Sequence, residues 1–331
     1  MNITITGATG FLGGALANRL INETDHNIVA CGRQVAIGKE LQSRSSKVTF
    51  LAGDLADPAY VKKAISAADR VFHCGALSSP WGARPTFEAA NIEGTRNVLK
   101  ACTEHGTGRL IHVSSPSIYH RNKVDQPLNE DAPIEGPALN HYIATKRVAE
   151  KLVRDSNQKS ITLRPRALFG PGDQTLFPRI LRANQKGRFP LIGGHDPLMD
   201  CTYIENAVDA LLLASEAPDE YEGKIYNITN DEPILRSELF TKLFEEVEMN
   251  FNPRIIPLTV AKALASLLEL GSHGFTMGRV EPLLTRYTVD VLSSGQVLDV
   301  SRAQRELGYD PKISIHQGLE EFGSWWRGGN R

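Results

Sequence analysis

The 331-residue sequence predicts an α/β fold, in which a doubly wound parallel sheet carries helices on both faces and a smaller C-terminal α/β part binds substrate. Three observations predict it. Short β-branched runs alternate with segments of helical periodicity through the first half, as is typical of parallel sheets. A glycine-rich turn separates the first strand from the first helix. After Arg164 the alternation loosens into turn-rich segments, which indicates a second, smaller unit.

The first-half strands are predicted from short runs of β-branched or apolar residues. They are expected at Ile3–Thr6, Asn27–Gly32, Val48–Leu51, Arg70–Cys74, Leu110–Ser114 and Ser160–Arg164. The helices between them are indicated by apolar residues that return every three or four positions. They are expected at Phe11–Ile21, Ala59–Ala67, Phe87–His105 and Tyr142–Asn157. GKIYNIT (223–229) predicts one further strand with helices on either side.

Composition narrows the class of function. Lys and Arg number 37 against 38 Asp and Glu, so no overall field recruits nucleic acid, and a small-molecule ligand is expected. The sequence has no apolar run long enough to span a membrane, and MNITIT begins as a strand and not as a signal peptide. The four cysteines lack a CxxC pair, which favours reduced, buried thiols in the cytoplasm. The histidines show no metal-binding spacing.

The turn after the first strand carries Gly7, Gly10 and Gly13 in the spacing GxxGxxG. These glycines permit a tight turn, a close approach of backbone to a pyrophosphate, and close packing of helix on strand. The helix amino terminus near Gly10 offers donors and positive potential to phosphates. We therefore expect a Rossmann dinucleotide-binding domain at residues 1–165, with core strands continuing beyond 165, and a mainly substrate-binding domain at 166–331, interleaved with it. A plain tight turn is the alternative.

The end of the second strand bears on the choice of cofactor. NAD-binding domains usually place an acidic residue there, where it holds the ribose 2′-hydroxyl, whereas this chain has Arg33. Because a guanidinium suits a 2′-phosphate, NADP(H) is expected in preference to NAD(H), although NAD(H) stays possible. The alternative is that Arg33 is a solvated loop charge.

Tyr142 and Lys146 are spaced YxxxK on a predicted helix, and this spacing puts both on one face. A free phenol has a pKa of about 10, and a neighbouring ammonium favours the phenolate, so the pair suits proton exchange. The strand Leu110–Ser114 runs into SSPSIY and presents Ser115 where open α/β sheets bind ligands. An exposed Tyr–Lys pair and a turn serine are the alternatives without a catalytic role.

Together, TGATGFLG, Ser115 and YxxxK resemble the extended branch of the short-chain dehydrogenase/reductase superfamily, which includes NAD-dependent epimerases and dehydratases. LRPRALFGPGD (163–173) and CTYIENAVDALLLA (201–214) are similar to motifs of that branch, with a modest departure at Glu205 and Asn206. YNITNDEPI (226–234), residues 301–322 and the WG at Trp81 are more similar to its 3β-hydroxysteroid dehydrogenase and sterol dehydrogenase subgroup. The resemblance covers nearly the whole chain.

The resemblance implies a role for each residue of a Ser–Tyr–Lys set. Ser115 would hydrogen-bond the substrate oxygen, Tyr142 would exchange its proton, and Lys146 would tune Tyr142 and hold the nicotinamide ribose. Asn91 would orient backbone and water behind Lys146, unless it is a structural amide. The resemblance also implies a homodimer through the helices Phe87–His105 and Tyr142–Asn157.

The cofactor-binding residues, expected from the glycine motif and the resemblance, lie at or near the ends of predicted strands and helices. They are Gly7, Thr9, Gly10, Phe11, Leu12, Gly13, Arg33, Asp54, Leu55, Cys74, Gly75, Ala76, Tyr142, Lys146, Pro165 and Arg166. In similar proteins the aspartate corresponding to Asp54 lies near the adenine, although an Asp there equally suits a helix N-cap.

The substrate site is expected to be largely apolar. Its candidate residues are Ser78, Trp81, Ser117, Phe169 and Phe177, and ordinary core packing is the alternative for each large apolar side chain. A group of arginines could instead clamp a carboxylate or a pyrophosphate. These are Arg166, Arg179, Arg182 and Arg188. The apolar segment 258–270 could form a substrate lid, a dimer contact or a peripheral membrane foot.

These patterns favour an NAD(P)-dependent oxidoreductase that moves a hydride between nicotinamide and a secondary alcohol or ketone. The expected substrate is a hydrophobic 3-hydroxy or 3-keto compound, either 3β-hydroxysteroid-like or an alkyl β-keto acid. One alternative is a sugar-nucleotide epimerase or dehydratase that retains NAD, and another is a binding protein that senses NADP(H). The complete Ser–Tyr–Lys set argues against the sensor, because sensing needs no proton relay.

Overall fold

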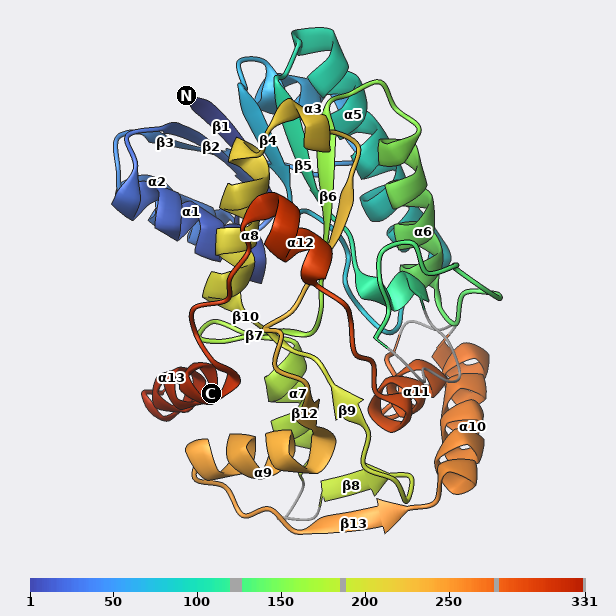
Figure 1. Ribbon diagram of the computed structural model, residues 1–331. Helices are drawn as coiled ribbons and strands as arrows, with labels where there is room; N and C mark the ends of the chain where they lie inside the picture. The colour runs from blue at the N-terminus through green and yellow to red at the C-terminus, as the bar shows by residue number, and fades with distance from the viewer. Residues whose placement is uncertain (120–126, 185–188, 277–279, 330–331) are drawn as a thin grey trace.

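A seven-stranded parallel sheet forms the centre of the protein (Figure 1). The computed structural model describes residues 1–119, 127–184, 189–276 and 280–329. The strands run in the order β11, β6, β5, β4, β1, β2, β3, and every pairing is parallel. Their bounds are β1 Asn2–Thr6, β2 Asn27–Gly32, β3 Val48–Ala52, β4 Arg70–His73, β5 Arg109–Val113, β6 Ser160–Pro165 and β11 Ile225–Ile228. The predicted doubly wound α/β fold is confirmed.

Helices cover both faces of this sheet (Figure 1). One face carries α1 (Phe11–Glu23), α2 (Val35–Ser43) and α8 (Ile204–Glu216), and the other carries α3 (Pro58–Ile65), α5 (Gly94–His105) and α6 (His141–Arg154). Arg19 on α1 donates hydrogen bonds to Glu205 and Asp209 on α8, although these two helices are far apart in sequence. The first face therefore combines both halves of the chain.

The predicted helix Phe87–His105 is divided into three parts. A short helix, α4 (Arg84–Phe87), leads into a π-helical turn at Glu88–Glu93, and α5 follows without a break. Short π-helical segments are rare and are frequently found at functional sites, because they redirect a side chain within a helix. Here the turn contains the buried Asn91.

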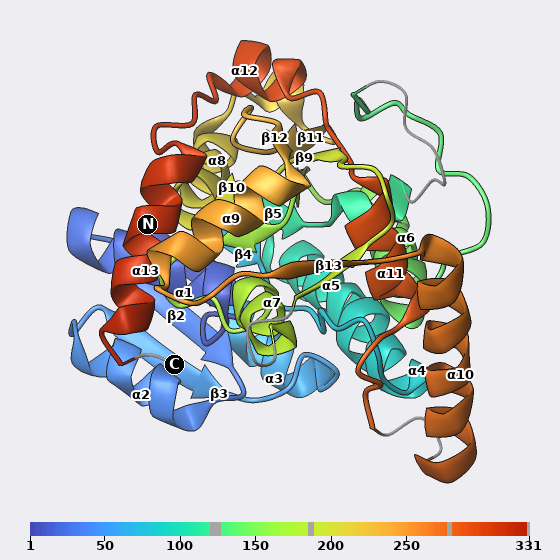
Figure 2. The ribbon, with the colours of Figure 1, turned by 90° about the horizontal axis from the view of Figure 1, so that it is seen from below.

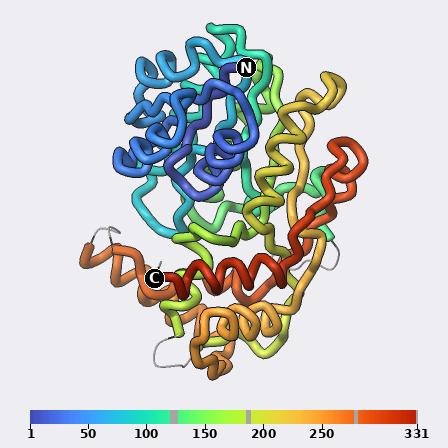
Figure 3. Tube along the Cα trace, turned by 90° about the vertical axis from the view of Figure 1, so that its left-hand side faces the viewer, coloured from blue at the N-terminus to red at the C-terminus, as the bar shows by residue number. Residues whose placement is uncertain are grey.

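The C-terminal part lies below the sheet in Figure 3, and it contains three two-stranded sheets. These pair β7 (Leu168–Phe169) with β10 (Thr202–Tyr203), β9 (Leu198–Met199) with β12 (Ile234–Leu235), and β8 (Phe189–Ile192) with β13 (Pro253–Ile256). The helices are α7 (Leu176–Ala183), α9 (Arg236–Glu246), α10 (Leu258–Thr276), α11 (Arg286–Ser294), α12 (Ser301–Leu307) and α13 (Ile315–Arg327). The chain returns to the main sheet in α8, β11 and α12. The proposed division at residue 165 stays a prediction.

Helix α10 lies at the edge of the molecule (Figure 2). Only three of its described residues, Ala261, Ala265 and Glu269, are buried, while large apolar side chains such as Leu267 and Leu270 face outward. The roles of lid, dimer contact and membrane foot all remain open. In the described ranges no helix is both long and apolar enough to cross a membrane.

Candidate active site

The loops that follow β1, β4 and β5 meet at the carboxyl edge of the sheet. The strand order reverses beside β1, and open α/β sheets bind ligands at such a switch point. The loops after β1 and β4 touch here, because a Cβ atom added to Gly7 would lie 2.8 Å from the Cα of Gly75. The carboxyl edge beside β1 is therefore the candidate ligand-binding site.

The turn between β1 and α1 fits the pyrophosphate of a dinucleotide. Gly7 has φ 71°, a left-handed conformation that favours glycine. A Cβ on Gly13 would lie 2.4 Å from the carbonyl oxygen of Gly7, so the helix can approach the turn only without a side chain there. Gly10 caps α1 without a side-chain hydrogen bond. The amides of the first helical turn, at Phe11 and Leu12, can therefore donate to phosphate oxygens.

Arg33 and Asp54 lie together near this turn. Arg33 follows β2 directly, is exposed, and has its guanidinium 3.8 Å from the carboxylate of Asp54, which follows β3. Thr9 packs against Gly32 at the end of β2, and Leu55 packs against Gly75. The two charged side chains therefore flank the route that the adenosine end of a dinucleotide would follow from the glycine turn.

The remaining predicted cofactor residues lie along the same edge. Cys74, Gly75 and Ala76 form the start of the loop after β4, and burial raises the pKa of the Cys74 thiol to about 12. Pro165 ends β6, and Arg166 follows it. All four cysteines are free, as expected.

Lys146 is buried on α6, and its Nζ donates a 2.7 Å hydrogen bond to the carbonyl oxygen of Val113 at the end of β5. Burial lowers the pKa of Lys146 to about 8, and the nearby Glu150 carboxylate partly opposes this effect. Glu150 is held by Arg164 of β6, whose Nε donates to it at 2.9 Å. Helix α6 is thus tied to both β5 and β6.

Tyr142 lies one turn before Lys146 on the same face of α6 and is half-buried. The helix begins after Asn140, whose side chain accepts a 2.9 Å hydrogen bond from the amide of Ile143. This cap gives the first turn, which contains Tyr142, a defined start.

Ser115 follows β5, and its Oγ forms a 2.9 Å hydrogen bond with the Oγ of Ser117. Ser114 is buried and its Oγ has no hydrogen-bond partner in the part of the chain that the structure describes, whereas Ser115 is partly exposed. Of these serines, Ser115 is the more accessible to a substrate oxygen. Its catalytic role stays a prediction.

Asn91 connects the loop after β4 with helix α6. Its Oδ1 accepts from the amide of Leu77 at 2.7 Å, and its Nδ2 donates to the Thr145 Oγ1 at 3.0 Å. Thr145 directly precedes Lys146, so this contact of Asn91 lies next to the lysine in sequence. A positioning role for Asn91 stays a prediction. The π-helical turn places the amide between these partners.

Two buried histidines lie beneath the site, and the sequence assigned neither of them a role in it. His73 on β4 bonds with the Thr6 Oγ1 at 2.8 Å and the Thr95 Oγ1 at 3.0 Å. Among the described residues, neither ring nitrogen of its neighbour His112 has a hydrogen-bond partner, and the two ring centres are 5.4 Å apart. Burial lowers the pKa of both rings, that of His73 to about 3.

On the substrate side, the loop after β4 meets α10. Trp81 stacks edge-on against His273 with ring centres 4.7 Å apart, and the exposed Ser78 belongs to the same loop. Tyr287 on α11 is a further residue that sequence reasoning missed. Burial raises the pKa of Tyr287 to about 12, and the nearby Tyr142 phenol contributes to this rise. Nothing in its local spacing signals a place near Tyr142.

Phe169 and Phe177 correct one expectation. Both rings are fully buried, and they pack on each other with centres 5.2 Å apart. Tyr203 and Phe322 complete this aromatic cluster. The two phenylalanines therefore belong to the core and have no surface with which to contact a substrate, contrary to the prediction.

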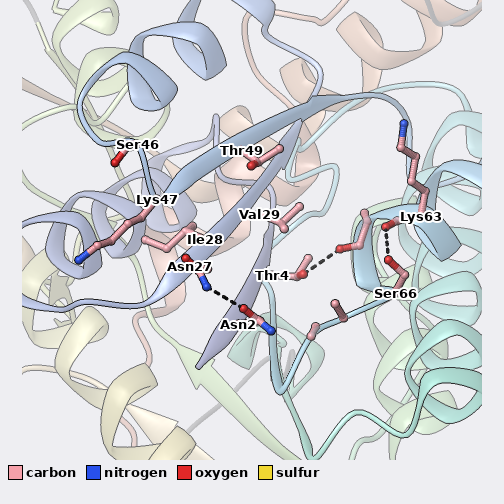
Figure 4. A pocket seen from close by; sticks show the side chains of 13 residues that line it. Asn2, Thr4, Asn27, Ile28, Val29, Ser46, Lys47, Thr49, Lys63 and Ser66 are labelled. Carbon is pink, nitrogen blue, oxygen red and sulfur yellow. Dashed lines mark hydrogen bonds between the residues drawn. The ribbon is translucent and has the colours of Figure 1, made fainter.

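A shallow hollow elsewhere does not coincide with this edge (Figure 4). It lies around the amino ends of β1, β2 and β3, where Asn27 donates a 3.0 Å hydrogen bond to Asn2 and Thr4 donates to the carbonyl of Ala64 at 2.8 Å. Ligands of open α/β sheets bind at the opposite, carboxyl edge. In the described part of the chain, no cluster of three or more His, Cys, Asp or Glu could hold a metal ion.

Comparison with known proteins agrees with this arrangement. The model of the 3-beta hydroxysteroid dehydrogenase/isomerase family matches residues 4–259. The 2-alkyl-3-oxoalkanoate reductase of Stenotrophomonas maltophilia is 37% identical over 97% of this chain and 98% of its own length. The decarboxylating sterol-4-alpha-carboxylate 3-dehydrogenase of Mus musculus is 27% identical over 96% of this chain and 88% of its own.

Among solved structures, the fold is shared with UDP-glucuronic acid 4-epimerase from Bacillus cereus in complex with NAD, at a TM-score of 0.78 and 20% identity over the full length of both chains. At this identity the likeness concerns the fold alone. The family match and the curated relatives carry the assignment further and confirm the resemblance seen in the motifs. The chain belongs to the 3-beta hydroxysteroid dehydrogenase/isomerase family of extended short-chain dehydrogenases/reductases, and it is an NAD(P)-dependent oxidoreductase.

Proposed function

We propose that this protein uses NADP(H) to interconvert a secondary alcohol and a ketone in a hydrophobic acid whose carboxylate is on the carbon next to the reacting one. The names of two relatives support this substrate class. A 2-alkyl-3-oxoalkanoate and a sterol 4α-carboxylate oxidised at C3 share that unit, a branched β-hydroxy or β-keto acid.

The observation that carries the proposal is the hydrogen bond from Lys146 to the carbonyl oxygen of Val113, which lies two residues before Ser115. Tyr142 lies one helical turn before Lys146 on α6. The bound nicotinamide would accept or supply the hydride at the reacting carbon. Ser115 would donate a hydrogen bond to the substrate oxygen when that oxygen is a ketone. Tyr142 would give its phenol proton to this oxygen in reduction and remove it in oxidation.

Lys146 would support this exchange through its charge. An ammonium held beside Tyr142 favours the phenolate form that accepts the proton during oxidation. Its fixed bond to the Val113 carbonyl keeps the ammonium from moving away. Asn91 would hold the surrounding backbone through Leu77 and Thr145.

The test is oxidation of a 2-alkyl-3-hydroxyalkanoate by the purified protein with NADP⁺ or NAD⁺, followed by the appearance of reduced nicotinamide. This direction uses a chemically stable β-hydroxy acid. We expect turnover with NADP⁺ preferred, and Tyr142→Phe should lower kcat by roughly 100-fold or more. Tyr221→Phe, at a partly exposed tyrosine away from the site, is the matched control. Undiminished turnover by Tyr142→Phe would exclude this mechanism.

Two further parts of the proposal concern the oligomeric state and the cellular location of the enzyme. We propose a homodimer formed through α5 and α6, where Val148 is an exposed apolar residue. Sedimentation of the wild-type protein and of Val148→Glu tests it, because a monomeric wild type would exclude the dimer.

We also propose a cytoplasmic location, which suits the four free thiols.

A further inference from the structure

We infer that Arg166 is the residue that makes the enzyme select acids, because its guanidinium binds the carboxylate next to the reacting carbon. The inference rests on the proposed function and goes beyond it, since it names the group of this chain that reads the substrate's charge.

The backbone of Arg166 is held on both sides at the carboxyl edge of the sheet. Its amide donates to the carbonyl oxygen of Ile228 at 3.0 Å, and its carbonyl oxygen accepts from the Thr202 Oγ1 at 2.6 Å. The next residue, Ala167, has φ 44°, so the chain turns sharply after Arg166. This side chain therefore starts from a fixed point directly after β6, the strand beside the one that leads to Ser115.

The guanidinium of Arg166 is unpaired within the described part of the chain. Its Nε is buried and has no hydrogen-bond partner, and the structure shows no ion pair for it. Two other buried arginines are paired: Arg164 is bound to Glu150, and Arg109 contacts Glu222 at 2.6 Å. The buried Arg236 also has an Nε without a partner, but its guanidinium donates to the carbonyl oxygen of Ile192 at 2.7 Å. Arg166 as a whole is only partly buried, but its Nε is buried without a partner, which is costly, and a bound anion would remove that cost.

The other candidate arginines are less suitable. Arg179 forms an ion pair with Glu281 at 3.2 Å, and Arg182 is exposed on α7. Arg188 lies outside the described residues. Only Arg166, among the candidates that the structure describes, combines a buried Nε with a guanidinium that has no partner in the described residues.

The surroundings of Arg166 point toward the reaction centre. Strand β6 pairs with β5, so Arg166 and Ser115 follow neighbouring strands at the same edge of the sheet. The phenol of Tyr287 is within electrostatic range of Tyr142, Arg166 and also Arg179. On another side is the buried Asp200, which uses its Oδ2 to accept a 2.7 Å hydrogen bond from the amide of Leu298. Asp200 attracts Arg166 but does not form an ion pair with it.

This placement suits a β-hydroxy or β-keto acid. In such a compound the carboxylate is attached to the carbon next to the one that carries the reacting oxygen. An oxygen at Tyr142 and a carboxylate at Arg166 would therefore belong to one short unit. A planar guanidinium can bind both carboxylate oxygens at once, which fixes orientation as well as charge, whereas an ammonium cannot reproduce this pairing.

The experiment compares a 2-alkyl-3-hydroxyalkanoate with its neutral methyl ester, both oxidised with NADP⁺. For Arg166→Gln we expect the acid-to-ester ratio of kcat/KM to fall by roughly 10- to 100-fold, the size of a hydrogen-bonded charge contact. The loss for the ester should be much smaller than the loss for the acid. Arg166→Lys should lose part of the preference, and Arg254→Gln, at an exposed arginine on β13, should lose none.

Titration of each variant with NADPH separates this role from cofactor binding and shows that the protein is folded. An unchanged NADPH affinity with an acid-selective loss supports the inference. Equal losses for acid and ester, or no loss in either Arg166 variant, overturn it while the proposed function stands. If the wild-type protein oxidises neither compound with either nucleotide, the proposed function fails, and this inference fails with it.

Discussion

Lys146 donates its hydrogen bond to the carbonyl oxygen of Val113, two residues before Ser115. One bond therefore sets the position of helix α6 relative to the strand that leads to the serine. It also holds a cation in a buried place, where burial lowers the pKa of Lys146 from 10.5 to about 8. That difference means that the buried charge destabilises the folded protein by roughly 3 kcal/mol at neutral pH.

Lys146→Met should abolish turnover, and it should change how stability depends on pH. Between about pH 8 and 10.5 the unfolded wild-type chain keeps the Lys146 proton while the folded protein has lost it. The wild type therefore gains stability relative to the variant as pH rises through this range, by roughly 3 kcal/mol. Urea unfolding of both proteins at pH 7 and pH 10 measures the change.

The control for this prediction is Lys151→Met, which removes an exposed lysine on the same helix. It should retain activity and show no such change with pH. If the difference in unfolding free energy between wild type and Lys146→Met were the same at both pH values, Lys146 would not be held as a costly charge.

Arg33→Ala tests the choice of nucleotide. If Arg33 binds the 2′-phosphate, the variant should bind NADPH roughly tenfold more weakly and NADH unchanged, a modest loss because the arginine is exposed. Fluorescence titration with both nucleotides gives the two dissociation constants, and Arg44→Ala, another exposed arginine, is the control. An equal loss for both nucleotides, or NAD that stays bound through purification, would favour the epimerase alternative.

Asn91→Ala tests a positioning role. It removes the partner of the Leu77 amide and of Thr145, which we expect to cost about 2 kcal/mol of stability and to lower kcat at least tenfold. Val98→Ala removes a fully buried side chain from α5 and should cost similar stability. If both variants kept the same kcat, the role of Asn91 would be purely structural.

Local signals were sufficient to predict the sheet and much of the site. The strands β1 to β6 are short β-branched or apolar runs, and the glycine turn and the Tyr142–Lys146 pair are each confined to one segment. Helix α2 was missed because only Gly38 and Leu41 are buried along it, which leaves little apolar periodicity.

Features that depend on contacts between residues far apart in sequence could not be predicted from local patterns. The π-helical turn lies where Asn91 meets Leu77 and Thr145. Leu77 belongs to no predicted helix and Thr145 to a different one from Asn91, so no local pattern brings the three together. Tyr287 reaches the site from α11, far along the chain from Tyr142. Phe169 looked like a pocket residue because its motif borders the cofactor in similar proteins, yet packing against Tyr203 encloses it.

The two buried histidines predict a loss of stability in acid that a single substitution should relieve. Burial holds the pKa of His112 well below its ordinary value of 6.5, so the folded protein keeps this ring neutral while the unfolded chain binds a proton below about pH 6.5. Because only the unfolded chain takes up this proton, the free energy of unfolding decreases as the pH falls below about 6.5. His112→Leu should therefore be more stable than the wild type by about 2 kcal/mol at pH 5 and show a much smaller gain at pH 7.5.

Thermal or urea unfolding at the two pH values measures this, with the exposed His105→Gln as control. His73 is retained in both proteins, so the part of the acid sensitivity that persists in His112→Leu would include its contribution. An equal stability difference at both pH values would mean that His112 is not held neutral by burial.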